Sequence, residues 1–234
     1  MKHIEFTGPA GSGKSALVER LTNENDHLFS KNEVIYKHFS PYQVIQTVLS
    51  RGGLGNIPKL GWSRYTKYKF FFEFAKCNPN FLSNSVLFIQ RQRGRHSNKE
   101  VSMMDVMSVY QLARETLTDN EILVLDEGFY HKTAVHAKHG DLPSEQYLSS
   151  IPTPDILIHV DPPIALARQR CKNRDGEVAT CELYKKSRQT KKDLTSMARE
   201  IGVHVIEVQN KEEIESTVEQ IRPDILELMN SDSL

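Results

Sequence analysis

The chain has 234 residues, 38% of them hydrophobic, which is enough for one large domain or two small ones; one domain with a helical insertion is the simpler arrangement. Thirty basic residues balance thirty acidic ones, so the chain as a whole is not a general polyanion binder. No apolar run spans a membrane, no signal peptide follows Met1, and the three cysteines match neither a zinc site nor a disulfide framework. We therefore expect a soluble, cytoplasmic protein in a reducing compartment.

Five short apolar segments are predicted to be strands. Two of them contain nearly continuous apolar runs, ILVL and ILIHV, rather than an alternation of apolar and polar residues. This pattern is typical of strands buried on both faces of a parallel sheet, so helices should cover both faces of an α/β fold. The predicted strands are Lys2–Thr7, Glu33–Phe39, Glu121–Asp126, Asp155–Asp161 and Val203–Val208.

The loop after the first strand carries a phosphate-binding motif. Its sequence, GPAGSGKS, matches G-x-x-x-x-G-K-[ST] and lies between a strand and a helix. The glycines let the backbone wrap around phosphate oxygens, Lys14 would reach the β- and γ-phosphates, and the Ser15 hydroxyl would bind Mg²⁺. A Gly-rich turn that merely opens a helix is the alternative. The predicted nucleotide-binding residues are Gly8, Pro9, Ala10, Gly11, Ser12, Gly13, Lys14, Ser15 and Ala16.

Three helices are predicted from apolar residues at helical spacing. The first begins near Gly13. The second runs from Ser102, as its N-cap, to about Leu117. The last, Lys211–Met229, contains Pro223, which should kink or break it.

The segment 40–101 is basic and aromatic. Between positions 40 and 99, ten basic residues accompany the single acid Glu73, so this part carries a formal charge of +9 and the remainder −9. Rings such as Trp62 and Phe70–Phe72 could stack on bases, or they could fill the core of a helical cap while the cations stay in water. We favour the second interpretation for the rings and expect the cations to face an anion. Candidates for a phosphate contact are Arg91, Arg93 and Arg95.

Two acids end the third predicted strand in the segment ILVLDEG. An acid at the carboxyl end of a parallel strand near a phosphate loop can hold Mg²⁺ or accept the proton of an attacking hydroxyl, and Asp126 is the candidate for both. A carboxylate that caps the next turn is the alternative. Glu127 leaves a second function open, because a glutamate here positions water in P-loop ATPases of the Walker B "DE" type. A GTPase would need D-x-x-G, and position 129 is Phe129.

Three histidines follow this strand on a probable helix. A pair spaced i, i+3 could bind a metal, but no third ligand stands at a telling spacing, so ordinary histidines are the better interpretation. The three are His131, His136 and His139.

The fourth predicted strand leads into an arginine-rich helix. PDILIHVDPP at 154–163 is followed by IALARQRCKNRDG. With the phosphate loop and the DEG strand, this order resembles the thymidylate kinase family, in which a strand ending in D-x-P-P leads into an A-L-x-R-x-R-x-x-x-R-type helix and a mobile lid. The resemblance covers the strands and the lid and little of 40–101. For any single arginine, a solvated helix face is the alternative.

The resemblance implies a three-layer P-loop NTPase fold with a five-stranded parallel sheet in the order 2-3-1-4-5 and helices on both faces. It implies one kinase domain, 1–234, with a helical acceptor-binding insertion at 40–101 and a lid at about 168–190. The lid arginines would close over the phosphates and neutralise the charge on the transferring phosphoryl group. By position they are Arg168, Arg170 and Arg174, with Lys172 weaker.

One position differs from the family pattern. Thymidylate kinases place an arginine that binds the acceptor's phosphate directly after the aspartate of this strand, where the present chain has Glu127. A carboxylate there would repel a monophosphate. A hydroxyl on a nucleoside, sugar or other polar metabolite therefore fits at least as well as a nucleotide.

These features predict a phosphotransferase that uses ATP and Mg²⁺ and a small acceptor, neutral or anionic, without a membrane partner; a homodimer is compatible with them. Two rivals remain: an ATPase that uses Glu127 to activate water, and a nucleic-acid-binding NTPase that acts through the basic segment 40–99. The predicted metal-binding residues are Ser15 and Asp126. The predicted catalytic residues are Lys14, Asp126, Glu127, Arg168, Arg170 and Arg174.

Overall fold

The computed structural model describes residues 1–39, 62–92, 99–137, 141–176, 180–211 and 213–231. Five strands form one sheet: β1 (Lys2–Thr7), β2 (Leu28–Ser30), β3 (Ile122–Leu125), β4 (Ile156–Val160) and β5 (Val205–Val208). The helices before β3 are α1 (Lys14–Glu24), α2 (Lys31–His38), α5 (Arg64–Cys77), α6 (Pro79–Arg91) and α7 (Lys99–Thr116). Those after β3 are α8 (Phe129–Ala137), α9 (Glu145–Leu148), α10 (Ile164–Asp175), α11 (Cys181–Glu200) and α12 (Ile214–Asn230).

The sheet is parallel throughout and its order is β2-β3-β1-β4-β5, which confirms the predicted order 2-3-1-4-5. β1 is the central strand: Ile4 is in register with Val124 of β3 on one side and with Ile156 of β4 on the other. The carboxyl ends of β1 and β3 therefore lie side by side, which brings the loops after these two strands together.

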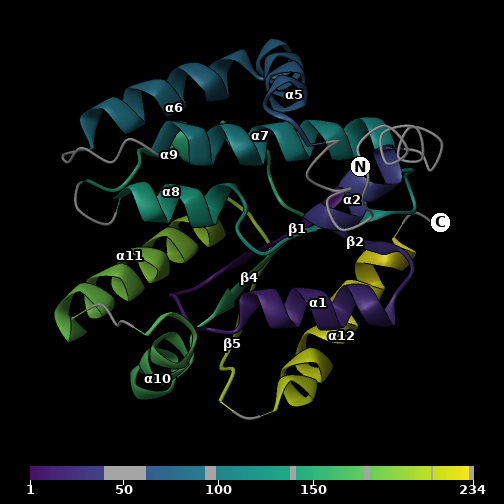
Figure 1. The fold of residues 1–234 in the computed structure, drawn as a ribbon. Coiled ribbons are helices and arrows are strands. Elements are labelled where there is room, and N and C mark those ends of the chain that lie inside the picture. Colours follow the sequence, from purple (N-terminus) through teal and green to yellow (C-terminus); the bar gives the residue numbers. More distant parts are fainter. Residues whose placement is uncertain (40–61, 93–98, 138–140, 177–179, 212, 232–234) are drawn as a thin grey trace.

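Helices cover both faces of the sheet, so the molecule has three layers (Figure 1). Side chains of a strand alternate between faces, and successive residues of β3 accordingly enter different cores. Leu123 and Leu125 pack with α2, α5, α6, α7, α8 and α11. Ile122 and Val124 pack with α1 and α12 on the opposite face. The continuous apolar pattern of the predicted strands reflects this burial on both faces.

The prediction of a strand at Glu33–Phe39 is wrong. The second strand is the three-residue β2, and positions 31–38 form helix α2. A capping box starts this helix: the Ser30 N–H donates to Glu33 Oε2 at 2.6 Å, and Ser30 accepts from the backbone of Glu33. Val34 and Ile35 then face the core. The residues VIY favour a strand, but the capping box and the burial of Val34 and Ile35 favour the helix more strongly.

Two predicted helix boundaries also differ from the structure. The helix predicted to begin with Ser102 as N-cap begins at Lys99, so Ser102 lies within its first turns. The last helix begins at Ile214 and continues through Pro223 to Asn230 as one element. Both helices exist and pack as the periodicity indicates.

The described part of the segment 40–101 forms α5, α6 and the start of α7, and positions 40–61 and 93–98 lie outside the described residues. α5 packs against α7. Phe74 stacks on Phe129 at 5.8 Å between ring centroids, and Phe81 meets the same ring edge-on at 5.3 Å. Of the rings for which we favoured a place in the core, Phe70 is fully buried and Trp62 stacks on it at 6.2 Å between ring centroids, whereas Tyr65 and Phe72 are exposed.

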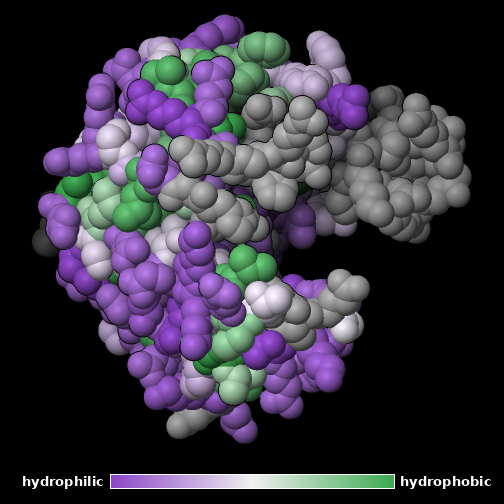
Figure 2. Space-filling view, turned by 90° about the vertical axis from the view of Figure 1, so that its left-hand side faces the viewer, coloured by the Kyte–Doolittle hydropathy of each residue, from purple (hydrophilic) through white to green (hydrophobic). Residues whose placement is uncertain are grey.

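Hydrophilic side chains predominate on the face that Figure 1 shows at its left, and apolar residues are scattered among them (Figure 2). Among the described helices, none combines the length and the apolar character that a membrane-spanning segment requires.

Candidate active site

The phosphate loop between β1 and α1 depends on glycine. Gly11 has φ of 74°, and a Cβ there would lie 2.2 Å from the backbone oxygen of Ala167 in α10. Two side chains hold the loop from other elements. The Asn210 amide donates to Ser12 O at 2.9 Å, and the Tyr184 hydroxyl donates to Ala10 O at 3.1 Å. The loop is thus held between the end of β5, α10 and α11.

Lys14 is buried and folded back over this loop. Its Nζ donates to Gly8 O at 3.1 Å, Pro9 O at 3.2 Å and Ser12 Oγ at 3.3 Å. Burial lowers the pKa of the Lys14 ammonium to about 8, although the neighbouring carboxylates of Glu127 and Asp126 act in the opposite direction. The lysine is therefore held where phosphate oxygens can replace the loop's own oxygens as its hydrogen-bond acceptors.

Ser15 and Asp126 meet across the two neighbouring strand ends. The Ser15 hydroxyl donates to Asp126 Oδ2 at 2.8 Å. A hydroxyl and a carboxylate are the hard oxygen ligands that Mg²⁺ prefers, and Mg²⁺ takes its remaining ligands from water and phosphate. Groups of three or more His, Cys, Asp or Glu side chains suited to a metal are absent from the described residues. The Ser15–Asp126 pair fits the predicted Mg²⁺ role without such a group.

A cavity of about 430 Å³, the phosphate cavity, opens over the phosphate loop. Arg170 and Arg174 line it because they lie four residues apart on one face of α10. Arg168 is not among its residues and lies on another side of that helix, so its predicted phosphate contact lacks geometric support. The lining residues are Ala10, Gly11, Ser12, Gly13, Lys14, Ser15, Ala16, Glu127, His131, Val135, Arg170, Arg174, Ser187 and Lys191.

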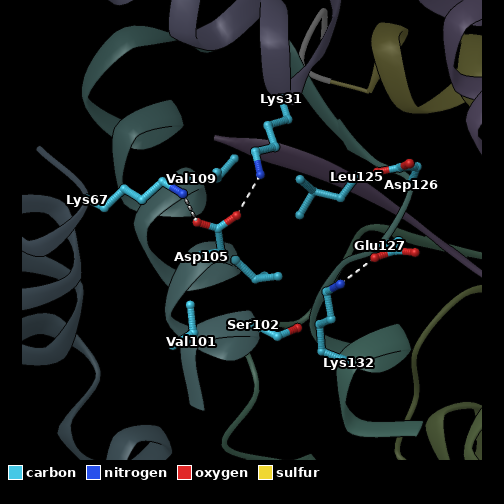
Figure 3. Close-up of a pocket in the computed structure, with 11 residues that line it drawn as sticks. Lys31, Lys67, Val101, Ser102, Asp105, Val109, Leu125, Asp126, Glu127 and Lys132 are labelled. Carbon is cyan, nitrogen blue, oxygen red and sulfur yellow. Dashed lines mark hydrogen bonds and ion pairs between the residues drawn. The ribbon is translucent and has the colours of Figure 1, made fainter. Parts of the chain in front are cut away.

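A second cavity of about 520 Å³ lies on the other side of the DEG turn, and we name it the acceptor cavity after the role that we propose for it below. Figure 3 shows Asp105 of α7 between two lysines, with Lys31 Nζ donating to Oδ2 at 2.8 Å and Lys67 Nζ pairing with Oδ1 at 2.7 Å. Burial alone would raise the pKa of Asp105, but its bonds to the two ammonium groups lower it, so the carboxylate stays ionised. The cavity is lined by Lys31, Lys67, Val101, Ser102, Asp105, Val106, Val109, Leu125, Asp126, Glu127 and Lys132.

Glu127 lines both cavities. It pairs with Lys132 of α8, and its side chain points toward that lysine, whereas Asp126 points away from Asp105 (Figure 3). Burial would raise the pKa of Glu127, but the hydrogen bond and charge of Lys132, with smaller contributions from Lys14 and Lys191, lower it. An ionised carboxylate therefore stands where the two cavities meet.

The sequence identified the phosphate loop, Asp126 and Glu127, but it missed much of the acceptor cavity. Lys31 and Asp105 carried no motif, and Lys67 was one of many cations in the basic segment. Arg91, which we considered for a phosphate contact, is exposed at the end of α6 and does not line either cavity. The available signal for Lys67 was its spacing from Phe70 and Phe74, which follow it at i+3 and i+7 and so place it on the buried side of α5.

Comparisons with known proteins support the fold alone. Neither a protein-family model nor a curated protein matches this sequence. Among solved structures, deoxyadenosine kinase from M. mycoides with bound dATP is similar with a TM-score of 0.54 and 12% identity over 95% of this chain and 98% of that chain. The same enzyme with bound dCTP, and with dCMP and a flexible dCDP, gives a TM-score of 0.49 at the same identity and coverage. The chain therefore has the α/β fold of P-loop kinases, with the sheet order given above.

Proposed function

We propose that this chain is a kinase that transfers the γ-phosphoryl group of ATP to a hydroxyl group of a small acceptor. One observation carries the proposal: a cavity built on a phosphate loop and a second polar cavity meet at the carboxylate of Glu127. A phosphoryl donor and a phosphoryl acceptor need separate sites whose reacting atoms come within bonding reach. An enzyme that only hydrolyses ATP has no need of the second cavity.

The residues of the phosphate cavity have separate roles in this proposal. Backbone N–H groups of the loop and Lys14 bind the phosphates, and Arg170 and Arg174 neutralise charge on them. Ser15 and Asp126, which meet through a hydrogen bond, would hold Mg²⁺. The bound metal would neutralise negative charge on the phosphate oxygens. Catalysis in such a site consists mainly of positioning and electrostatic stabilisation.

The transfer step balances with groups of this chain. The acceptor hydroxyl oxygen forms a bond to the γ-phosphorus, the bond from that phosphorus to the bridging oxygen breaks, and ADP leaves with the electron pair. The hydroxyl proton goes to Glu127, which is ionised and lines both cavities. We assign the base role to Glu127 rather than Asp126, because Glu127 lines both cavities, whereas Asp126 lines the acceptor cavity alone and accepts the Ser15 hydroxyl.

The charges of the acceptor cavity favour a neutral acceptor. Its described lining holds three lysines and three carboxylates. Lys31 and Lys67 are paired with Asp105, and Lys132 is paired with Glu127. A phosphate or carboxylate on the acceptor would meet lysines whose charge these pairs already neutralise, and it would approach Glu127 at close range. Because the similar structure with a TM-score of 0.54 is a deoxyadenosine kinase with bound dATP, nucleosides are the first acceptors to test.

The test is a screen of hydroxyl-bearing metabolites with ATP labelled in the γ-phosphate. We expect one class of neutral acceptor to gain label with wild-type protein and to lose about 1,000-fold in kcat/KM with Lys14→Met. The variant should keep its circular dichroism spectrum. Label that enters no acceptor, while inorganic phosphate is released at the full rate, would contradict the kinase proposal.

An ATPase is the second candidate, because Glu127 also lines the phosphate cavity, where it could activate water. Phosphate release without any acceptor, reduced about 100-fold or more in Glu127→Gln, would favour the ATPase. In the kinase, phosphate release without acceptor should be slow in both proteins, and Glu127→Gln should lower kcat for the acceptor.

A further inference from the structure

A fully buried carboxylate lies against the turn that carries Asp126 and Glu127. Glu5 of β1 has no exposed surface, like its apolar neighbours Ile4 and Phe6. Taking a carboxylate out of water is costly, and replacing a buried charged group by an apolar one of similar volume is often neutral or stabilising. A gain in stability therefore does not account for a glutamate at this position, and its contacts indicate another role.

Glu5 holds both ends of this turn. Its backbone is in register with Leu125, the last residue of β3, after which the turn starts. Its side chain extends to the other end of the turn, where Oε2 accepts the backbone N–H of Tyr130 at 3.0 Å. Tyr130 is the second residue of α8, and the N–H groups in the first turn of a helix have no acceptor within the helix. The carboxylate of Glu5 supplies that acceptor from another element, and its charge suits the positive end of the helix.

The glycine of the DEG turn is needed because of this carboxylate. The backbone of Gly128 does not have a left-handed φ, so its conformation alone would admit other residues. A Cβ at Gly128, however, would lie 2.3 Å from the carboxyl carbon of Glu5 and 2.5 Å from Oε2. Glu5 thus packs directly against the backbone of the turn, and only a residue without a side chain leaves room for it.

The helix that Glu5 anchors also holds Glu127. Lys132 of α8 reaches back to pair with Glu127 Oε2, as the dashed line in Figure 3 shows. His131 Nε2 lies 3.6 Å from the other oxygen, Oε1. The backbone N–H of Lys132 donates to Gly128 O at 3.0 Å and so begins the hydrogen bonds of the helix. The position of Glu127 between the two cavities therefore depends on where α8 begins, and Glu5 fixes this start.

We propose that Glu5 is a positioning residue, which fixes the DEG turn so that Asp126 and Glu127 lie where phosphoryl transfer needs them. Glu5 does not itself reach a ligand, because it has no exposed surface. Its role rests on the proposed kinase function. A misplacement of about 1 Å in a reacting group can cost about 100-fold in rate. A turn without this anchor should therefore still bind both substrates but should transfer the phosphoryl group slowly.

The experiment separates the anchoring oxygen of Glu5 from the size of its side chain. Glu5→Gln keeps an oxygen that can accept the Tyr130 N–H, whereas Glu5→Met has a similar size and no such oxygen. With the acceptor found in the screen, kcat should fall about 100-fold in Glu5→Met and less than about 5-fold in Glu5→Gln. KM for ATP and for the acceptor should change less than about 2-fold, because the lining of both cavities is kept. An unchanged kcat in Glu5→Met, or an equal loss in Glu5→Gln, would overturn the proposal.

Asp155→Ala is the matched control for a purely structural loss. Asp155 also accepts a backbone N–H of β1, that of His3 at 2.7 Å, but it does so at the amino end of the strands. The phosphate loop and the DEG turn lie at the carboxyl ends. Urea denaturation identifies conditions in which both variants are folded, and kcat is measured there. Asp155→Ala should keep the kcat of wild type. A loss of kcat equal to that of Glu5→Met would mean that Glu5 acts through stability alone.

Gly128→Ala tests the same anchor if Glu5→Met does not fold. Because the new methyl group overlaps the carboxylate, either Glu5 or the turn has to move, and both movements break the contact. We expect kcat to fall at least about 10-fold with little change in KM. An unchanged kcat in Gly128→Ala would overturn the proposal.

Hydrogen exchange separates failure of the anchor from failure of the kinase proposal, because it needs no activity. The Tyr130 amide should exchange faster in Glu5→Met than in wild type or Glu5→Gln, since its acceptor is lost. Equal exchange rates in the three proteins would overturn the anchor. Faster exchange in Glu5→Met, in a wild-type protein that labels no acceptor, would support the anchor and contradict the kinase.

Discussion

The two cavities that meet at Glu127 are built in different ways. The phosphate cavity rests on backbone, with a loop whose glycines approach other main-chain atoms closely, and its cations outnumber its carboxylates. The acceptor cavity is built from side chains of α2, α5, α7 and α8, and its lysines equal its carboxylates in number. The first arrangement suits one fixed, highly charged ligand part, and the second suits a neutral ligand recognised by hydrogen bonds.

The largest effect we predict tests the backbone character of the phosphate cavity. In Gly11→Ala, the new Cβ would lie 2.2 Å from Ala167 O, in addition to the strain of φ at 74°. We expect a loss of about 2–3 kcal/mol in the free energy of unfolding and a loss of about 100-fold in ATP affinity, measured by urea denaturation and calorimetry.

Gly202→Ala is the matched control, since Gly202 also has a left-handed φ, 90°, but has nothing within 4 Å of a new Cβ. It should cost only the backbone strain of about 1 kcal/mol and leave ATP affinity unchanged. Equal effects of the two variants would mean that the close approach of the loop to α10 is unimportant.

The phosphate loop could be predicted because a short continuous segment of the sequence specifies it. Eight consecutive residues specify the phosphate loop, and four of the five strands were predicted from buried apolar runs. The prediction of the second strand failed for two physical reasons. Its three residues are too few for a periodic pattern. The capping box at Ser30 and Glu33 also starts a helix where the propensity of the sequence indicated a strand. The sheet order was nevertheless right, because it follows from the fold family.

The acceptor cavity could not be predicted, because the residues that line it come together only through packing. Asp105 and Lys31 are 74 positions apart, and neither lies in a motif. Their meeting depends on α2 being a helix, which the sequence reading had wrong. Lys191 of the phosphate cavity was overlooked for a similar reason, since nothing local distinguishes it from Lys186 on the same helix.

A smaller effect tests the charge balance of the acceptor cavity. Asp105→Asn would leave Lys31 and Lys67 without their carboxylate partner, so the cavity would become positive. We expect the KM for a neutral acceptor to rise about 10-fold with little change in kcat, because one charge-assisted contact is lost on the acceptor side. Anionic compounds such as nucleoside monophosphates should inhibit the variant more strongly than the wild type.

Asp119→Asn, at an exposed position after α7, is the control for a change of net charge alone. Steady-state kinetics of both variants with the acceptor found in the screen decide the point. An unchanged KM in Asp105→Asn, or anions that bind no better, would mean that the matched charges do not select the acceptor.

The smallest effect concerns the anchoring of α11, the helix that closes the phosphate cavity. Burial would raise the pKa of Asp161, but its bonds to Arg188 and Lys192 lower it below the ordinary value of 3.8. Because the folded-state pKa is depressed, the ion pairs stabilise the protein above that ordinary value, and the contribution is lost as pH falls through the lower folded-state value. Asp161→Asn should therefore lower the free energy of unfolding at pH 7 by about 1 kcal/mol, since Arg188 and Lys192 remain partly in water.

Urea denaturation of wild type and Asp161→Asn from pH 7 to pH 2 measures this contribution directly. The difference between the two proteins should be constant down to about pH 5 and should shrink toward zero below pH 3, as protonation removes the charge of Asp161 in the wild type. Asp193→Asn, on the same helix, should show a smaller difference, because its partner Gln189 is neutral. A difference that persists undiminished at pH 2 would mean that Asp161 stabilises the fold through its shape and hydrogen bonds rather than its charge. The anchoring of α11, unlike the phosphate loop it covers, would then not depend on electrostatics.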